Sequence, residues 1–154
     1  GTMMFALDPA GAAIGGWQPG GFAGFEVVGE HGAPMWFETL SKNYPASVAF
    51  YQKAFGWQTA TLSDTEEFRY TTLGAGEEAK AGIMDAAGLL PEQVPSMWQA
   101  YLGVVDADAA LVTAVALGGS VISPAQDTPY GRLAQVADPT GALVSVMQHS
   151  SVTG

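Results

Sequence analysis

The stretch Arg132–Gln148, with the sequence RLAQVADPTGALVSVMQ, predicts two β-strands joined by a tight turn. Residues 133–137 supply the first strand, Asp138–Gly141 supplies the turn, and residues 142–148 supply the second strand. The order Asp-Pro-x-Gly favours a turn because aspartate accepts backbone hydrogen bonds, proline presets φ, and glycine tolerates a left-handed exit. We therefore expect this stretch to form a β-hairpin.

A second copy of this pattern lies at the other end of the chain. Residues 7–18, with the sequence LDPAGAAIGGWQ, align with residues 137–148 without a gap. We therefore expect residues 1–33 to be the remnant of a preceding module, made of this turn, a strand and a linker. A strand without neighbours offers its backbone N–H and C=O groups for pairing, so we expect residues 12–18 to join a second copy in a homodimer.

Composition and charge exclude several classes of function. Of the 154 residues, 48% are hydrophobic and 13% are charged, so the chain can bury a sizeable core. The formal net charge of −10 argues against binding to nucleic acid or to an anionic membrane. No apolar run reaches the length of a membrane span, and the absence of cysteine fits the cytosol. We expect a cytoplasmic domain with neither nucleic acid nor membrane as a partner.

The chain between the two turns predicts the order strand, helix and three strands, twice. In the first half, a strand over residues 35–40 precedes a helix that opens at Asn43-Tyr44-Pro45 and ends at Gly56. The next three strands are expected over residues 57–62, 68–73 and 79–84.

In the second half, a strand over residues 97–105 precedes a helix that Asp106 or Asp108 caps and Gly118-Gly119 ends. A long polar loop is expected over residues 124–129. The remaining strands are expected over residues 120–123, 132–136 and 142–147.

These patterns predict an α+β domain over residues 34–149. It consists of two βαβββ modules, residues 34–86 and 97–149, that form a curved mixed sheet with a concave cavity and helices outside. Residues 12–18 add an extra N-terminal strand.

Four short motifs, taken in order, resemble the vicinal oxygen chelate superfamily, which includes glyoxalase I, bleomycin-resistance proteins and extradiol dioxygenases. They are Phe50-Tyr51-x-x-x-Phe55-Gly56-Trp57, Trp98-x-x-Tyr101-Leu102-Gly103-Val104, Leu117-Gly118-Gly119 and Asp138-Pro139-Thr140-Gly141. The resemblance covers residues 34–149 and is closest to the tandem glyoxalase-like proteins of actinobacteria, in which a linker joins one domain to the next.

The resemblance also implies where a metal ion would bind in this fold. Metal-dependent members use His, Gln or Glu at four strand positions, which correspond here to Trp36, Met84, Gln99 and Ser145. Tryptophan and methionine do not bind a hard, oxygen-liganded ion, serine is a poor ligand, and one glutamine cannot hold a metal alone. We therefore expect no metal and no other cofactor.

Strand alternation separates two faces of the predicted sheet. Ala100, Leu102 and Val104 suit packing under a helix, as do Val144 and Val146. The opposite face mixes large apolar side chains with a few polar ones, which is typical of a small-molecule pocket, although a filled core is the alternative. The predicted ligand-binding residues are Trp36, Glu38, Met84, Gln99, Tyr101, Ser145 and Met147. The expected ligand is small and aromatic or apolar.

Glu38 is the catalytic candidate on this face. A carboxylate among Trp36, Tyr101 and Met147 would lose much of its hydration and would be suited to act as a general base. The alternative is a structural Glu38 that is hydrogen-bonded to Tyr101 or to a backbone amide. Separately, Arg69, Tyr130 and Arg132 lie near predicted loops and are candidates for steering an anionic ligand.

Two function classes follow from these residues, because this fold hosts many chemistries. The first is a binding or sequestering domain of the bleomycin-resistance type, without a complete metal site. The alternative is a metal-dependent lyase, isomerase or dioxygenase with a non-standard site and Glu38 as its base. A third reading makes this domain a structural half whose partner carries the active site.

Overall fold

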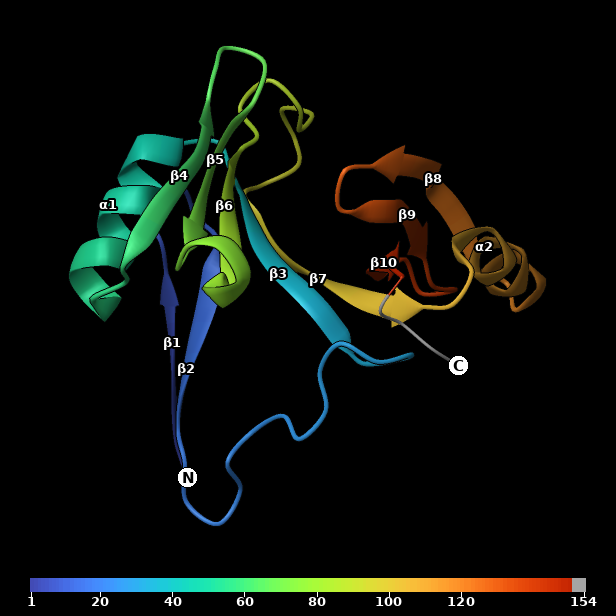
Figure 1. The fold of residues 1–154 in the computed structure, drawn as a ribbon, viewed down its shortest axis with the longest axis horizontal. Coiled ribbons are helices and arrows are strands. Elements are labelled where there is room, and N and C mark those ends of the chain that lie inside the picture. The colour runs from blue at the N-terminus through green and yellow to red at the C-terminus, as the bar shows by residue number, and fades with distance from the viewer. Residues whose placement is uncertain (151–154) are drawn as a thin grey trace. The chain divides into compact units, whose positions relative to one another are not determined.

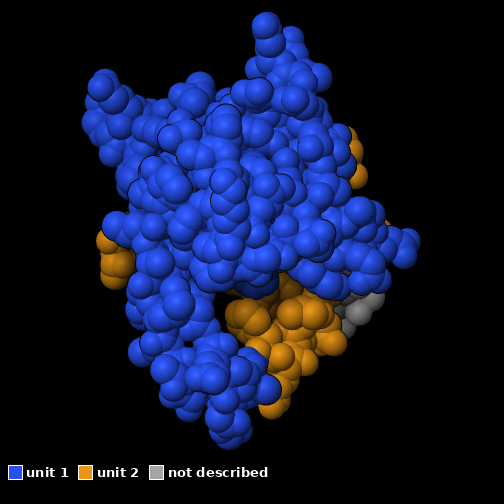
Figure 2. Space-filling model, turned by 90° about the vertical axis from the view of Figure 1, so that its left-hand side faces the viewer, with its two compact units in different colours: residues 1–24, 37–99 blue, residues 25–36, 100–154 orange. Residues whose placement is uncertain are grey.

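The structure is a computed structural model that describes residues 1–150 and divides into two compact units. Unit 1 contains residues 1–24 and 37–99, and unit 2 contains residues 25–36 and the chain from Ala100 onward. Figure 1 shows the elements along the chain and Figure 2 colours the two units.

Unit 1 is built on the first strand-helix-three-strand module. The module consists of β3 (Pro34–Ser41), α1 (Tyr44–Phe55), β4 (Thr59–Asp64), β5 (Arg69–Leu73), the 3₁₀ turn Gly76–Glu78 and β6 (Ala81–Asp85). The strand order is β4-β5-β6-β3, in which β6 runs parallel to β3 and the other pairs are antiparallel. Pro45 lies in the first turn of α1, and Gly56 ends the helix in a left-handed conformation with φ of 66°, as predicted.

An aromatic core lies between α1 and this sheet. Tyr51 has no exposed surface, and it stacks on Trp57 with ring centroids 4.8 Å apart. Ile83 of β6 is buried in the same cluster, against which Trp98 of β7 (Met97–Val104) also packs. Burial of these large side chains supplies much of the stability of unit 1.

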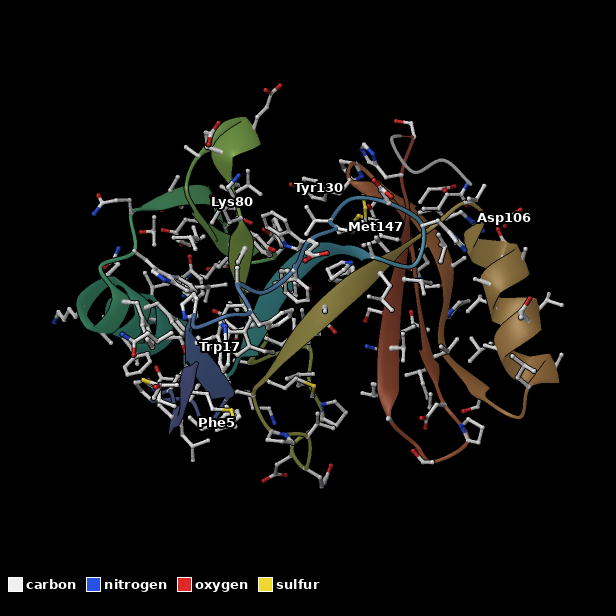
Figure 3. The ribbon with its side chains drawn as sticks, turned by 90° about the horizontal axis from the view of Figure 1, so that it is seen from below. Phe5, Trp17, Lys80, Asp106, Tyr130 and Met147 are labelled. Carbon is white, nitrogen blue, oxygen red and sulfur yellow. The ribbon has the colours of Figure 1, made fainter. Side chains whose placement is uncertain are left out.

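Unit 1 also contains an N-terminal ribbon of two antiparallel strands, β1 (Thr2–Leu7) and β2 (Ala13–Gln18). β2 covers the strand that the sequence predicts, whereas β1 was not predicted. Figure 3 labels Phe5 and Trp17 on the ribbon, and these side chains are 76% and 45% exposed. Among residues 1–150, β1 and β2 pair only with each other.

The turn of this ribbon docks on α1 through a buried carboxylate. Asp8 is 4% exposed, and its Oδ1 accepts hydrogen bonds from the backbone N–H groups of Ala10 and Ala12 at 2.8 and 2.9 Å. Its Oδ2 accepts hydrogen bonds from Ser47 Oγ and Tyr51 OH, both at 3.1 Å. We call these two α1 groups the hydroxyl pair. With four donors, the buried carboxylate is fully satisfied and attaches the ribbon to the helix.

The hydroxyl pair is itself held by further hydrogen bonds. Ser47 Oγ lies 2.8 Å from Ser41 Oγ, and Trp98 Nε1 donates to Tyr51 OH at 2.8 Å. Burial raises the pKa of the Tyr51 hydroxyl above its ordinary value, and the negative charge of Asp8 raises it further, against an opposing effect of the Trp98 N–H. Tyr51 therefore remains a neutral donor to Asp8 well into the alkaline range.

Unit 2 repeats the module. After β7 it contains α2 (Ala107–Ala116), β8 (Ser120–Thr128), β9 (Gly131–Ala137) and β10 (Leu143–Gln148). The strand order is β7-β10-β9-β8, with β10 parallel to β7 and antiparallel to β9. Asp106 Oδ1 accepts from the Ala109 N–H at 2.9 Å, so Asp106 rather than Asp108 caps α2. Val104, Ala134 and Val146 are buried with Ala107 of α2.

The predicted loop over residues 124–129 is wrong, because β8 continues to Thr128. Its pairing with β9 shifts register between Val121 and Ser123 and again between Ser123 and Gln126. β8 is the last strand in the order of unit 2, and proline is tolerated at such edges and bulges, so Pro124 does not end the strand.

Residues 25–33 run beside β7 within unit 2. The N–H of Gly32 donates to Gly103 O at 2.8 Å, and the N–H of Gly103 donates to Ala33 O at 2.9 Å. A Cβ on Gly103 would lie 2.5 Å from Glu30 O, so only glycine permits this close approach.

The strand-helix-three-strand module of each unit thus has one parallel and two antiparallel strand pairings and one α-helix, which confirms the predicted α+β class with mixed pairing. None of the helices within residues 1–150 combines the length and apolar character that crossing a bilayer requires. The assignment of residues 1–33 to a preceding module stays a prediction.

Candidate functional site

The predicted site residues fall into both units. Unit 1 contains Glu38, Met84 and Gln99, whereas unit 2 contains Trp36, Tyr101, Ser145 and Met147. The structure therefore gives the geometry of each group separately.

Glu38 is the centre of the group in unit 1. It is 6% exposed on β3, where Oε2 accepts a hydrogen bond from Tyr70 OH at 2.8 Å and Oε1 accepts one from Gln99 Nε2 at 2.7 Å. We call Glu38, Tyr70 and Gln99 the Glu38 trio. Two strong donors on one buried carboxylate fix the positions of the phenol and the amide as well.

The trio lies on the face of the unit 1 sheet opposite α1. Residues Thr71 and Ile83 contact α1, because Thr71 Oγ1 is hydrogen-bonded to Tyr44 OH and Ile83 is in the aromatic core. Successive side chains of a strand alternate between faces, so Tyr70 and Met84, which are paired across β5 and β6, point the other way. Glu38 pairs with Gly82 and shares that face.

Gly82 makes the contact between Tyr70 and Glu38 possible. A Cβ on Gly82 would lie 1.8 Å from the Tyr70 hydroxyl oxygen and 2.3 Å from its Cζ. The tyrosine ring therefore crosses β6 over the glycine to reach Glu38 on β3. Tyr70 and Gly82 were missed by the sequence analysis, which proposed Tyr101 or a backbone amide as the partner. The sequence signal for this contact was Gly82 itself, because a glycine inside a strand often marks a place where another group lies close to the backbone.

The group in unit 2 centres on Ser145. It is 4% exposed and pairs with Tyr101 on the parallel strand β7 and with Gln135 on the antiparallel strand β9. Gln135 Nε2 donates to Ser145 Oγ at 3.1 Å. Met147 is 8% exposed, two residues along the same strand, and Trp36 is partly buried on β3. The alternate residues Val144 and Val146 pack toward α2, as predicted.

These donor sets do not fit a divalent metal ion. Unit 1 offers one carboxylate and one amide, and both carboxylate oxygens already accept hydrogen bonds. Unit 2 offers the Ser145 hydroxyl at the corresponding position. Metal sites of catalytic type use about three protein ligands rich in His and carboxylate. Within residues 1–150, no three His, Cys, Asp or Glu side chains gather closely enough to hold one ion.

The predicted role of Arg69 and Arg132 in steering anions is not supported. Arg69 lies 2.8 Å from Asp64 and 3.6 Å from Asp85, so its charge is balanced. Arg132 forms ion pairs with Asp108 and Asp127 at 2.8 and 2.9 Å. Its hydrogen bonds hold the pKa of the Asp108 carboxyl below its ordinary value.

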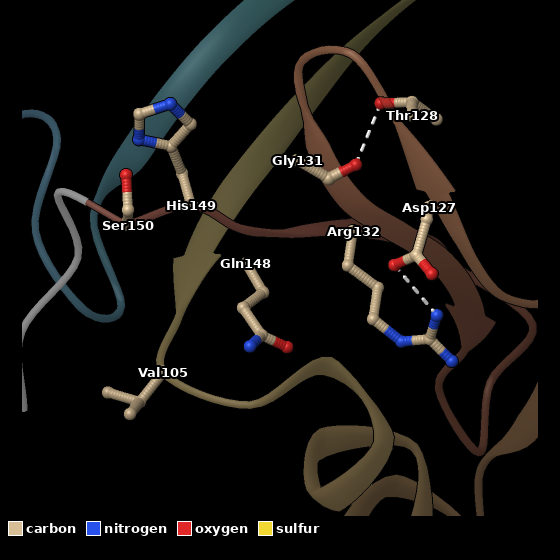
Figure 4. Close-up of a pocket in the computed structure, with 8 residues that line it drawn as sticks. All are labelled: Val105, Asp127, Thr128, Gly131, Arg132, Gln148, His149 and Ser150. Atoms are coloured by element: carbon tan, nitrogen blue, oxygen red, sulfur yellow. Dashed lines mark hydrogen bonds and ion pairs between the residues drawn. The ribbon is translucent and has the colours of Figure 1, made fainter.

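Arg132 also lines a hollow of about 400 Å³ in unit 2 (Figure 4). The lining residues are Val105, Asp127, Thr128, Gly131, Arg132, Gln148, His149 and Ser150. Because the guanidinium is already paired with two carboxylates, the hollow has no evident attraction for an anionic ligand.

Comparison with known proteins supports the fold and identifies the family. The model of the Glyoxalase/Bleomycin resistance protein/Dioxygenase superfamily matches residues 36–146. The fold resembles that of the Streptomyces coelicolor methylmalonyl-CoA epimerase, with a TM-score of 0.54 and 17% identity over 77% of this chain and 95% of that one. It also resembles the hypothetical protein BH1468 from Bacillus halodurans, with a TM-score of 0.56 and 12% identity over 75% and 92% of the two chains.

Two relatives are similar in sequence over nearly the whole chain. The Mycobacterium tuberculosis protein named "Putative glyoxylase CFP32" is 37% identical over 96% of this chain and 56% of its own length. The anthracycline biosynthesis protein DnrV of Streptomyces peucetius is 34% identical over 96% of this chain and 53% of its own length. The chain therefore spans a little over half the length of these curated relatives. From its motifs, its two modules and these matches, the chain belongs to the glyoxalase/bleomycin resistance/dioxygenase superfamily.

Proposed function

We propose that this chain is a small-molecule-binding domain of the glyoxalase/bleomycin-resistance type that acts without a complete metal site. The Glu38 trio carries this proposal. It places a buried carboxylate, a phenol and an amide in fixed positions on the sheet face opposite α1, beside the apolar Met84. Sparse, fixed polar groups among apolar side chains are typical of sites that orient a small ligand.

The expected ligand is aromatic or apolar. Trp36 and Tyr101 remain the predicted aromatic contacts, with Ser145 and Met147 as further predicted contacts. The name of DnrV supports this ligand class, because anthracyclines contain planar fused aromatic rings. The net charge of −10 disfavours a strongly anionic ligand.

The alternative is a lyase or isomerase in which Glu38 is the general base. The position of Glu38 favours it, because Glu38 is buried on the sheet face that is predicted to line the pocket, where a general base must lie to reach a substrate. The metal-dependent form of this chemistry requires ligands that the described residues do not supply together. Elemental analysis after dialysis against Mn²⁺, Ni²⁺ or Zn²⁺ separates the two. One tightly held metal per chain would support the enzyme and contradict the binding domain.

Titration with a panel of uncharged anthraquinones and flavones, followed by tryptophan fluorescence and calorimetry, tests the binding proposal. We expect saturable binding that Glu38→Gln weakens by about tenfold or more, since a buried hydrogen bond to a charged group contributes about 1.5–3 kcal/mol. Glu67→Gln, an exposed change in the same unit, is the matched control and should leave affinity unchanged. Equal affinities of the Glu38 variant and the parent chain, or no binding by any probe, would refute the proposal.

A further inference from the structure

The chain contains the same turn twice, at residues 8–11 and 138–141. In both, the aspartate N–H donates to an alanine carbonyl at 2.9 Å, and the glycine N–H donates to the aspartate carbonyl at 2.9 Å. Gly11 and Gly141 have φ of 90° and 93°. The side-chain bonds agree too, because Asp138 Oδ1 accepts from the N–H groups of Thr140 and Ala142 at 2.8 and 2.9 Å. The two turns are therefore the same local structure.

The two aspartates differ in their second carboxylate oxygen. Asp8 Oδ2 accepts from the hydroxyl pair of α1, at Ser47 and Tyr51. Asp138 is exposed, and its hydrogen bonds with Thr140 and Ala142 all reach Oδ1. The oxygen that docks the first turn on α1 is therefore not used by these bonds in the second turn.

We propose that the Asp138 turn is a docking surface for a second module of the βαβββ type. The chemistry of the partner follows from the docked copy. It is the first helix of that module, with a serine four residues before a tyrosine, so that both hydroxyls reach one carboxylate oxygen. Residues four apart lie on the same face of a helix, as Ser47 and Tyr51 do on α1.

Two observations favour this partner over a second copy of the same chain. The hydroxyl pair of each copy is already occupied by its own Asp8, so an intact copy has no vacant site for Asp138. The chain spans a little over half the length of its curated relatives. Those relatives are therefore long enough to contain at least one further module. When two similar modules pair symmetrically, each contact occurs twice with the roles exchanged, so one docked turn implies a second.

A full-length variant tests whether the Asp138 turn fits such a site. Residues 8–12 and 138–142 read DPAGA and DPTGA, so Ala10→Thr converts the docked turn into the exposed one. We expect the midpoint of thermal unfolding to change by less than about 2 °C, which corresponds to less than about 1 kcal/mol for a chain of this size. A loss as large as that caused by Asp8→Ala would contradict the proposal, because the second turn would then not fit.

A second experiment tests docking in trans. A protease site is inserted in the full chain between Gly20 and Gly21, which are exposed, and the cut protein is studied by native mass spectrometry. Synthetic residues 1–18 and 131–148 then compete for the place of the ribbon, each with an aspartate-to-asparagine control at position 8 or 138. We expect 131–148 to displace the ribbon, and its Asp138→Asn control to do so about tenfold less effectively.

Several outcomes would overturn the proposal. Displacement by residues 1–18 but not by 131–148 would restrict docking to the first turn. Equal displacement by 131–148 and its control would show that the carboxylate is not recognised. Loss of the ribbon on cleavage alone would remove the premise that Asp8 attaches it. Self-association of the intact chain that Asp138→Asn abolishes would assign the turn to a second copy instead.

Discussion

The Asp8 turn and the Asp138 turn share their backbone conformation and the hydrogen bonds that their backbone N–H groups donate, but they have opposite surroundings. The Asp138 turn has one more bond, from the Thr140 hydroxyl. Asp8 is buried against α1 and has donors on both carboxylate oxygens. Asp138 is exposed, and donors within its own turn hold the pKa of its carboxyl below the ordinary value, with the Thr140 hydroxyl contributing most. The local sequence thus determines the turn, whereas the packing partner determines how much that turn contributes to stability.

The flanking strands differ in the same way. In unit 2, the hairpin of β9 and β10 has β8 on one side and β7 on the other. In unit 1, the ribbon of β1 and β2 is attached through its turn and has no further strand beside it among residues 1–150. A β-hairpin without neighbouring strands is marginally stable alone, so the ribbon depends on its contacts with the rest of unit 1. These are the hydrogen bonds of Asp8 to α1 and the packing of Ile14 against the aromatic core.

The largest difference is expected when each aspartate is replaced by alanine. Asp8→Ala removes two turn hydrogen bonds and leaves two buried hydroxyls without an acceptor, at a cost of about 3–5 kcal/mol. Asp138→Ala removes bonds that water replaces, at a cost of about 1 kcal/mol. Urea unfolding of both variants measures the difference, and equal losses would show that the two turns are equivalent after all.

A smaller loss is expected from the tyrosine of the hydroxyl pair. Tyr51→Phe leaves the aromatic core nearly unchanged but removes a donor to Asp8 and the acceptor for Trp98, at a cost of about 1–3 kcal/mol. Tyr130→Phe is the matched control, because Tyr130 is 50% exposed and should lose less than about 0.5 kcal/mol. A Tyr51 variant as stable as the control would indicate that its hydroxyl contributes nothing.

The raised pKa of Tyr51 predicts a pH dependence. The tyrosine ionises near pH 10 in the unfolded chain and only at higher pH in the folded one. Its contribution to the free energy of unfolding is therefore fully present below about pH 10. That contribution is lost as the pH rises from about 10 toward the folded value. The free energy of unfolding should therefore fall more steeply above pH 10 in the parent chain than in Tyr51→Phe. Parallel curves would contradict the assignment.

The free edges of the ribbon lead to the smallest expected effect. The predicted homodimer through this strand pair stays a prediction, and it implies concentration-dependent association in sedimentation. Phe5→Lys places a charge on the exposed ribbon and should shift the protein toward monomer, because lysine on an edge strand opposes strand addition. A parent chain that is monomeric over the whole concentration range would refute the dimer.

The sequence predicted those parts of the fold that depend on local chemistry. The end of α1 at Gly56, an aspartate cap for α2, the Asp138 turn and the alternation of β10 were predicted correctly, because capping residues and turn glycines act within a few residues. The long β8 was missed, since Pro124 was taken to end a strand and is instead tolerated at a bulge.

The site was less predictable. Glu38 and Gln99 were named as neighbours on one face, and the structure joins them by a hydrogen bond. Tyr70 was missed because its contact with Glu38 depends on crossing Gly82, a feature of strand register rather than of sequence. The docking of Asp8 on Ser47 was also missed, because these residues are far apart in the chain and meet only through tertiary packing.

The most direct test of the central claim is a double-mutant cycle between Asp8 and Tyr51. The free energies of unfolding are measured for the parent chain, Asp8→Ala, Tyr51→Phe and the double variant, and the same cycle is made with Asp138→Ala as the control. Docking predicts a coupling of about 1–3 kcal/mol between Asp8 and Tyr51, and additivity within about 0.5 kcal/mol between Asp138 and Tyr51. Additive effects in both cycles would contradict the claim that the Asp8 turn is held by the hydroxyl pair.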